Sequence, residues 1–211
     1  MHNSVNDIRD LAKLLGLSPT TVSRVLNGKS EKYRISNLTA QKVKQAAKDY
    51  NYSPSKIARG LKMDRTDTIG LIIPDISNPF FADIAYSIEK EARLKGYSII
   101  LCDSVDDLTV EKELITLLRS HKVDGIIIAP VGTRYEHIIN LYNSWIPLVV
   151  IDRCFPGLNL PSITSDNFQG GYDATNHLIS LGHQKIACIQ GMPESFPNKE
   201  RLRGYIEAHE N

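Results

Sequence analysis

The chain has 211 residues, of which 42% are hydrophobic and 23% charged, and its formal net charge at pH 7 is +1. This composition is typical of a globular protein and excludes a disordered or collagen-like chain. We expect neither a membrane span nor a secretory signal, because no long apolar stretch and no charged-then-apolar N-terminus occurs. Three widely spaced cysteines are expected to be reduced thiols in or near a core, without a bound metal, in a cytoplasmic protein: Cys102, Cys154 and Cys188.

Positive charge is concentrated at the N-terminal end. The first 65 residues hold 13 Lys and Arg against 5 Asp and Glu, a net charge of +8, whereas the other 146 hold 12 against 19, a net charge of −7. A basic segment attracts the phosphate backbone of a nucleic acid, and an acidic body avoids nonspecific adhesion to it. The split therefore indicates nucleic-acid binding by the N-terminal region.

The start of the chain has the pattern of two short helices joined by a tight turn. Apolar residues at helical spacing predict a first helix over 7–15, and Gly16 then permits the turn. Ser18 followed by Pro19 predicts the start of a second helix over 19–27, because a side-chain oxygen can cap the free amides and the proline ring suits the first turn.

The second predicted helix presents polar side chains on the face opposite its valines. Thr20, Arg24 and Asn27 share that face at i, i+4 and i+7. The guanidinium of Arg24 can hold a guanine with two hydrogen bonds. The hydroxyl groups of Thr20, Thr21 and Ser23 can bond bases or phosphates. An amphipathic helical hairpin without a DNA-binding role is the alternative that this pattern alone leaves open.

A resemblance to a known family rests on the run from Asp7 to Gly28, which reads DIRDLAKLLGLSPTTVSRVLNG. This run closely resembles the opening of the LacI/GalR family of bacterial transcription regulators, and the resemblance continues to the last residue. It implies a helix-turn-helix DNA-binding domain over 1–52, a hinge helix or linker over 53–66, and an effector-binding domain over 67–211. The residues that match major-groove readers of the family are Pro19, Thr20 and Arg24. The residues that match its helix-supporting or phosphate-contacting positions are Ser18, Thr21, Ser23 and Asn27.

The chain departs from the family pattern at 29–34, where the connection to the next helix is about three residues longer than usual. The bases of this segment could add phosphate contacts, or the segment could be only a solvated loop. A third helix is predicted over 36–50. Its predicted inner side consists of Leu38, Val43, Ala46 and Ala47.

Residues 51–61 resemble the hinge of the family. Ser53 and Pro54 can start a helix, but a piece of about eight residues that contains Gly60 is marginal alone in water. The resemblance implies that this piece becomes helical when two protomers meet on DNA, and that Leu61 then wedges into the minor groove and kinks it. An ordinary linker, with Ile57 and Leu61 packed on the body, is the alternative.

From Asp67 onward, short apolar runs alternate with amphipathic helices, which predicts an α/β domain with a parallel sheet covered on both faces. The resemblance makes this a periplasmic-binding-protein-like domain. The predicted strands are 68–73, 97–102, 123–129, 147–151, 162–165 and 185–190. The predicted helices are 80–95, 109–120, 134–143, 168–181 and one that opens over 195–201. In the helix over 109–120, the predicted inward residues are Val110, Leu114, Leu117 and Leu118.

Ligands of such sheets bind beyond the carboxyl ends of the strands. Asn78 and Phe80 follow the first predicted strand, and Asp152 and Arg153 follow the fourth. An aromatic ring, a carboxylate and a guanidinium together suit a hydroxyl-rich ring. Arg153 could instead point to solvent. The positions that match the effector cleft of the family are Asn78, Phe80, Asp152 and Arg201.

Motifs for catalysis are missing: the chain has no phosphate-binding glycine loop, no H-E-x-x-H and no Ser/His/Asp arrangement that the sequence could support. The resemblance then implies a cytoplasmic transcription regulator, a repressor rather than an enzyme, without a cofactor. Its expected partners are double-stranded operator DNA, a second copy of the chain and a small-molecule effector such as a carbohydrate. A ligand-binding protein of the periplasmic sugar-receptor type is the alternative from another class.

Measured against the family, the chain stops just after the first helix of the second subdomain. We therefore expect a truncated effector domain, with an N-subdomain and only the start of a C-subdomain. Such a domain lacks one wall of the cleft and leaves an unpaired sheet edge. We expect the 211-residue chain to bind effector poorly or not at all.

Overall fold

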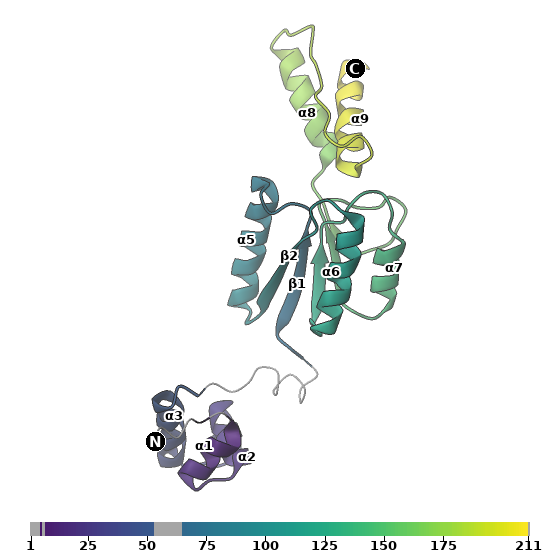
Figure 1. The fold of residues 1–211 in the computed structure, drawn as a ribbon. Coiled ribbons are helices and arrows are strands. Elements are labelled where there is room, and N and C mark those ends of the chain that lie inside the picture. The colour runs from purple at the N-terminus through teal and green to yellow at the C-terminus, as the bar shows by residue number, and fades with distance from the viewer. Residues whose placement is uncertain (1–4, 6, 53–64, 211) are drawn as a thin grey trace. The chain divides into compact units, whose positions relative to one another are not determined.

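The structure, a computed structural model, describes residues 5, 7–52 and 65–210. The chain divides into two compact units, Met1–Thr66 and Asp67–Asn211, which we call the head and the body (Figure 1). Most of the predicted hinge, including Leu61, lies outside the described residues.

Three helices form the head: α1 (Ile8–Leu15), α2 (Pro19–Leu26) and α3 (Asn37–Asp49). Each begins at a polar N-cap whose side chain accepts a backbone N–H, namely Asp7, Ser18 and Ser36. Gly16 ends α1 at a φ of 63°, a left-handed conformation that glycine adopts without steric cost. Local signals therefore set the helix boundaries of the head.

The core of the head consists of small and branched side chains from all three helices: Leu11, Ala12, Val22, Val25, Ala40, Val43, Ala46 and Ala47. The prediction that Leu38 belongs to this core is wrong, because 65% of the residue is exposed. Leu38 precedes Val43 by five residues, which places it about 140° away around the helix. Ala40 precedes Val43 by three residues and takes the inward position instead.

The body contains a five-stranded sheet in the order β2-β1-β3-β4-β5, and every pair of neighbouring strands is parallel. Leu71 aligns with Leu101 on one side and Ile127 on the other. The winding reverses between β1 and β3, which places a topological switch point at their carboxyl ends. The strands are β1 (Thr68–Ile73), β2 (Ser98–Asp103), β3 (Gly125–Ile128), β4 (Leu148–Ile151) and β5 (Ser162–Ile163).

Helices cover both faces of the sheet, as Figure 1 shows. α5 (Pro79–Leu94) covers one face, where Phe81 packs with Leu71 and Ile73. The other face is covered by α6 (Leu108–Ser120) and α7 (Glu136–Asn143), whose apolar side chains pack with Ile72. Alternate residues of β1 thus serve opposite cores, as the pleat of a strand requires.

The buried face of α6 differs from the predicted one. Leu117 is 44% exposed, whereas Glu111, Ile115 and Leu118 are buried at i, i+4 and i+7. Glu111 is not among the predicted inward residues, and a carboxylate is costly to bury without hydrogen-bond partners. The partners exist in the fold: the Val131 N–H donates to Glu111 at 2.7 Å, and Nε2 of His137 lies 2.6 Å from the other oxygen.

The last two helices, α8 (Asn167–Ser180) and α9 (Phe196–Glu210), pack side by side (Figure 1). The predicted strand over 185–190 between them is wrong, because no described strand pairs with this segment and Ile189 is 97% exposed. A strand is stabilised by ladder hydrogen bonds to a neighbour. Cys188 of the same segment is exposed, contrary to the prediction, whereas Cys102 is buried and both are free thiols. None of the described helices is both long and apolar enough to cross a membrane.

Candidate functional site

The N-terminus of α2 is fixed by the residues that the sequence singled out. Oγ of Ser18 accepts the Thr21 N–H at 3.1 Å and shares a hydrogen bond of 2.8 Å with the Thr21 hydroxyl. Pro19 occupies the first helical position. An N–H at that position has no acceptor within the helix, so proline loses no hydrogen bond there. The helix therefore starts at a defined residue, and its exposed end carries Thr20.

At the other end of α2, Asn27 closes the helix. Its amide nitrogen donates to the Ser23 carbonyl oxygen at 2.7 Å and lies 3.3 Å from the Ser23 hydroxyl. Seven of the eight predicted DNA-binding residues thus lie on α2 or at its caps. The eighth, Leu61, lies outside the described residues.

Arg24 has a partner that the sequence analysis missed. Its guanidinium carbon lies 3.8 Å from the ring centroid of Tyr33, so the two groups are stacked. Tyr33 belongs to the lengthened connection 29–34, which is folded into turns. The Tyr33 N–H donates to the Lys29 carbonyl at 3.3 Å, and the Ile35 N–H donates to that of Ser30 at 2.9 Å. The aromatic residue within a basic segment was the only signal of this contact in the sequence.

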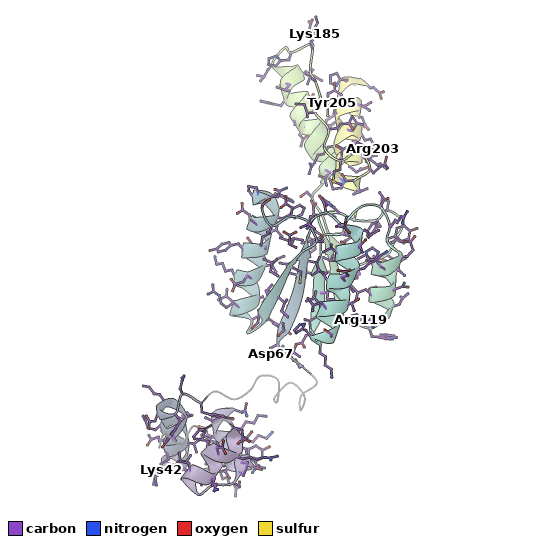
Figure 2. The ribbon with its side chains drawn as sticks, viewed as in Figure 1. Lys42, Asp67, Arg119, Lys185, Arg203 and Tyr205 are labelled. Carbon is purple, nitrogen blue, oxygen red and sulfur yellow. The ribbon has the colours of Figure 1, made fainter. Side chains whose placement is uncertain are left out.

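Basic side chains surround the head without entering its core. Lys42 on α3 is exposed and projects away from the helix (Figure 2). The other exposed bases of the described head are Arg9, Lys13, Lys29, Lys32, Arg34, Lys44, Lys48 and Arg65. A surface of this sign attracts a polyanion and gives binding that weakens with salt.

At the carboxyl edge of the sheet, one arginine forms hydrogen bonds from its own loop to two other loops. Nη1 of Arg153, just after β4, donates to Asp106 at 2.8 Å and to the Pro130 carbonyl at 3.3 Å. Its guanidinium carbon lies 5.7 Å from the ring centroid of Phe81. Only 14% of the Arg153 side chain is exposed. The alternative that Arg153 points to solvent is therefore wrong.

Asp152, beside it, is half-buried and has a φ of 59°, which is uncommon for a residue with a side chain. Burial raises the pKa of Asp152 above its ordinary value, while the charges of Arg153 and Arg201 act in the opposite direction. An unusual backbone conformation and a carboxylate withdrawn from water both cost free energy, and such costs concentrate at functional sites.

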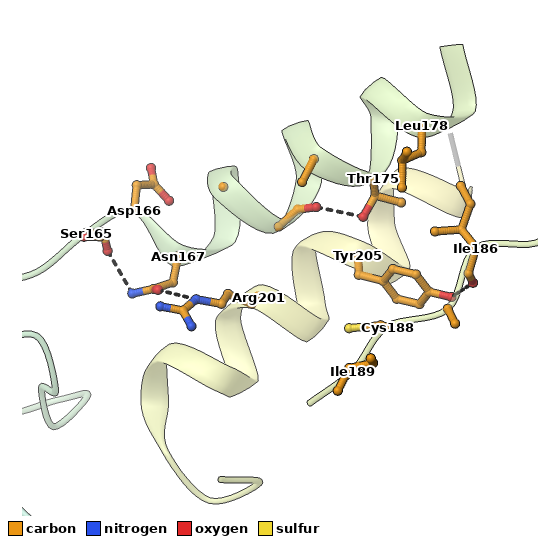
Figure 3. Close-up of a pocket in the computed structure, with 14 residues that line it drawn as sticks. Ser165, Asp166, Asn167, Thr175, Leu178, Ile186, Cys188, Ile189, Arg201 and Tyr205 are labelled. Carbon is orange, nitrogen blue, oxygen red and sulfur yellow. Dashed lines mark hydrogen bonds between the residues drawn. The ribbon is translucent and has the colours of Figure 1, made fainter. Parts of the chain in front are cut away.

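Arg201 on α9 lies against the start of α8. Its Nε donates to Oδ1 of Asn167 at 2.8 Å, and the Asn167 amide donates to the Ser165 carbonyl at 3.1 Å (Figure 3). Both side chains line a cavity of about 570 Å³ between α8, α9 and the segment 186–189. The Tyr205 hydroxyl closes one side of it by donating to the Ile186 carbonyl at 2.8 Å.

The four predicted effector residues share neither this cavity nor a second one beside Arg153. Asn78 caps α5 by accepting the Phe80 N–H at 3.1 Å, and Phe80 is 47% exposed. Asp152 lies within electrostatic reach of Arg201, the one member of the four that lines either described cavity. The second cavity, of about 190 Å³, has walls that the sequence analysis did not foresee: Tyr135, Phe155, Met192 and Phe196. These residues belong to no motif, so only the fold reveals them.

Two family models match the chain. Residues 7–55 match "Bacterial regulatory proteins, lacI family", and residues 66–211 match "Periplasmic binding proteins and sugar binding domain of LacI family". The first match covers the three helices of the head. The second covers the whole of the sheet and its helices.

Similar proteins cover nearly the whole chain. It is 36% identical over 205 residues to the HTH-type transcriptional repressor PurR of Aliivibrio fischeri, and this match covers 96% of this chain and 59% of the relative. It is 38% identical over 203 residues to the ribose operon repressor of Halalkalibacterium halodurans, with coverage of 96% and 59%. The chain thus spans about three fifths of the length of these relatives.

Among solved structures, the Lac repressor dimer bound to operator and the anti-inducer ONPF superposes with a TM-score of 0.85. That match has 26% identity and covers 96% of this chain and 61% of the other. The predicted fold class, a helix-turn-helix head followed by a periplasmic-binding-protein-like α/β domain, is confirmed. The chain belongs to the LacI family of bacterial regulatory proteins.

Proposed function

We propose that the chain is the DNA-reading and effector-sensing part of a cytoplasmic transcription regulator that represses its target. In this proposal, residues 1–52 read DNA, 53–66 form the hinge and 67–211 belong to the effector-binding domain. The observation that carries the proposal is α2 itself: a capped helix with Thr20 and Arg24 on its outer side, in a head with exposed bases on α1, on α3 and in the connection 29–34.

DNA reading follows from the geometry of α2. A helix of this size enters the major groove, and a guanidinium there can bond both acceptors of a guanine. Because Ser18 and Asn27 fix both ends of α2, Thr20 and Arg24 are held one turn apart on a defined helix. A homodimer would set two such helices against two half-sites of double-stranded operator DNA. Leu61 would wedge into the minor groove between them.

Effector sensing is assigned to the carboxyl edge of the sheet. The half-exposed Phe80 ring offers a stacking surface for the apolar face of a sugar. Asp152 and Arg201 offer an acceptor and a donor for its hydroxyl groups, and Asn78 lies at the start of α5, two residues before Phe80. A carbohydrate that binds one arrangement of the domain better than another shifts the population that is competent for DNA.

A ligand-binding protein of the periplasmic sugar-receptor type is the second candidate. The matched sugar-binding model over 66–211 supports it as well as it supports the regulator. That function, however, gives no role to the capped α2 or to the basic head. We therefore favour the regulator.

The test is a selection of bound duplexes from a randomised library by the 211-residue chain at low ionic strength. We expect a recurring half-site that contains a G·C pair, with affinity that falls as salt is added. Recovery of no preferred duplex at any ionic strength would contradict the regulator and leave the receptor function. Because we expect the 211-residue chain to bind effector poorly, a screen of carbohydrates for release of the selected duplex uses a version extended to the length of the relatives and tests the effector assignment separately.

A further inference from the structure

The stacking of Arg24 on Tyr33 joins the predicted base-reading residue to the part of the head that departs from the family pattern. The guanidinium carbon lies 3.8 Å from the ring centroid. Arg24 is half-buried as a result, although it stands on the outer side of α2. Tyr33 keeps 41% of its surface exposed, so the pair lies at the surface and not in the core.

The connection holds Tyr33 in this place through its own hydrogen bonds. The Lys29 N–H donates to the Arg24 carbonyl at 2.9 Å, which anchors the start of the connection to the last turn of α2. The Ile35 N–H donates to the Ser30 carbonyl at 2.9 Å, and Ile35 packs on the core of the head. The ring is therefore carried by a folded segment that is anchored at both ends.

Stacking and base reading use different parts of the guanidinium. A cation over a ring contacts the ring through the flat face of the guanidinium, whereas hydrogen bonds to a base leave from its N–H edge. A stacked arginine can therefore still make both bonds to a guanine. Because a free arginine side chain loses rotamer freedom when it binds, prior placement by the ring lowers the entropic cost of the contact.

We infer that Tyr33 is a positioning residue for DNA reading: its ring orients Arg24 for a guanine, so Tyr33 sets how strongly the head prefers G·C at one position. This inference rests on the proposed function. It assigns the lengthened connection 29–34 a role in specificity, beyond the phosphate contacts that its bases can make.

The experiment measures affinity for the duplex that the wild-type chain selects from the randomised library, and for copies of it in which each G·C pair in turn is replaced by A·T. The variants are Tyr33→Ala, Tyr33→Phe and, as a matched control, Tyr50→Ala. Tyr50 is also in the head, is likewise 41% exposed, and has no place in the DNA-reading face. Thermal unfolding of each variant shows whether the head is intact.

We expect Tyr33→Ala to lower affinity for the selected duplex by about twofold to fivefold, the range of a surface cation–π contact. The loss should disappear in the one duplex copy whose G·C pair at the Arg24 contact is replaced by A·T. Tyr33→Phe and Tyr50→Ala should bind as the wild type does. In an Arg24→Ala background, Tyr33→Ala should have no further effect, because the residue acts through the arginine.

Each other outcome separates one failure from another. If the wild-type chain selects no duplex, the proposed function fails. If it selects one and Tyr33→Ala binds it as tightly and as selectively, the inference alone fails. An increase in affinity on Tyr33→Ala would show that the ring keeps Arg24 from binding DNA. An equal loss of affinity for all duplex copies, also in the Arg24→Ala background, would show that Tyr33 itself contacts a phosphate. Both results overturn the positioning role.

Discussion

Gly171 of α8 lies so close to the backbone of Arg201 in α9 that neither helix has room for a Cβ atom between them. A Cβ on Gly171 would lie 2.9 Å from the Arg201 Cα and closer still to its carbonyl oxygen. Gly204 meets α8 in the same way, because its Cβ would lie 2.7 Å from the Tyr172 nitrogen. This close crossing sets Arg201 where its Nε reaches Asn167 at 2.8 Å.

Replacing either of two adjacent glycines of α8 with alanine should change the free energy of unfolding in opposite directions. Gly171→Ala must push α8 from α9, so we expect it to lower the free energy of unfolding by about 1–3 kcal/mol. Gly170→Ala is the matched control, because nothing lies within 4 Å of its Cβ and the residue is in the same helix. That change should raise the free energy of unfolding by about 0.4–1 kcal/mol, since alanine restricts the unfolded chain. Urea unfolding of both variants measures the difference, and equal stabilities would refute the close crossing.

Sequence reasoning succeeded where the signal is local and failed where it needs a distant partner. Gly16 and the Ser18-Pro19 pair predicted the helix boundaries of the head because a turn and a cap involve only a few neighbouring residues. The contact of Arg24 with Tyr33 could not be predicted in this way, since it depends on how a connection folds back. The segment 185–190 carries a strand pattern, but a strand forms only beside another strand.

The candidate effector site shows the same division. The periodicity of the body placed Asp152 and Arg153 at the end of a strand, and the sheet has them there. Burial of Arg153 beneath its contacts with Asp106 and Pro130 follows from the order of strands in the sheet, which periodicity does not reveal. The sequence therefore indicated the edge of the sheet that carries polar side chains, and the tertiary contacts determine their arrangement.

Arg24 should contribute specificity as well as affinity. We expect Arg24→Ala to weaken binding of the selected duplex by about 1–3 kcal/mol, because the base contact is lost. Arg24→Lys keeps the charge but cannot form two parallel hydrogen bonds. It should therefore keep the salt dependence of the wild type while it discriminates less between G·C and A·T at one position. Equilibrium binding at several salt concentrations, with duplexes altered at that pair, distinguishes the two variants.

Asp152 should make stability depend on pH. Burial raises its pKa in the folded chain above the ordinary value of 3.8, against the opposing charges of Arg153 and Arg201. A carboxyl with a raised folded pKa contributes stability that is complete below the unfolded pKa and is lost as the pH rises through the folded pKa. The amide of Asp152→Asn does not titrate. The free energy of unfolding of this variant, relative to the wild type, should therefore increase from about pH 3 to about pH 7, a range that spans the pKa of a carboxyl group.

Urea unfolding of Asp152→Asn and the wild type at both pH values measures this change. Asp83→Asn is the control, because Asp83 is exposed on α5 and should not show the same increase. A relative stability of Asp152→Asn that stays constant or falls between the two pH values would show that the guanidinium groups of Arg153 and Arg201 outweigh burial.

Glu111 should be essential to the packing of α6 despite its charge. The residue is fully buried, and its carboxylate accepts the Val131 N–H at 2.7 Å while it lies 2.6 Å from Nε2 of His137. Nδ1 of His137 is already buried without a hydrogen-bond partner among the described residues. Glu111→Ala would leave two further buried polar groups unpaired and open a cavity, so we expect a loss of about 2–5 kcal/mol in the free energy of unfolding.

Glu113→Ala is the control for this prediction, because Glu113 lies on the same helix and is exposed. Its stability should stay within about 0.5 kcal/mol of the wild type, as is usual for a surface substitution. Glu111→Gln keeps an acceptor for Val131 but presents an amide to His137, which forces the imidazole to place its proton on the unpartnered Nδ1. That variant should therefore fall between the two alanine variants in urea unfolding. Equal stability of Glu111→Ala and Glu113→Ala would mean that the buried carboxylate makes no net contribution to the free energy of unfolding.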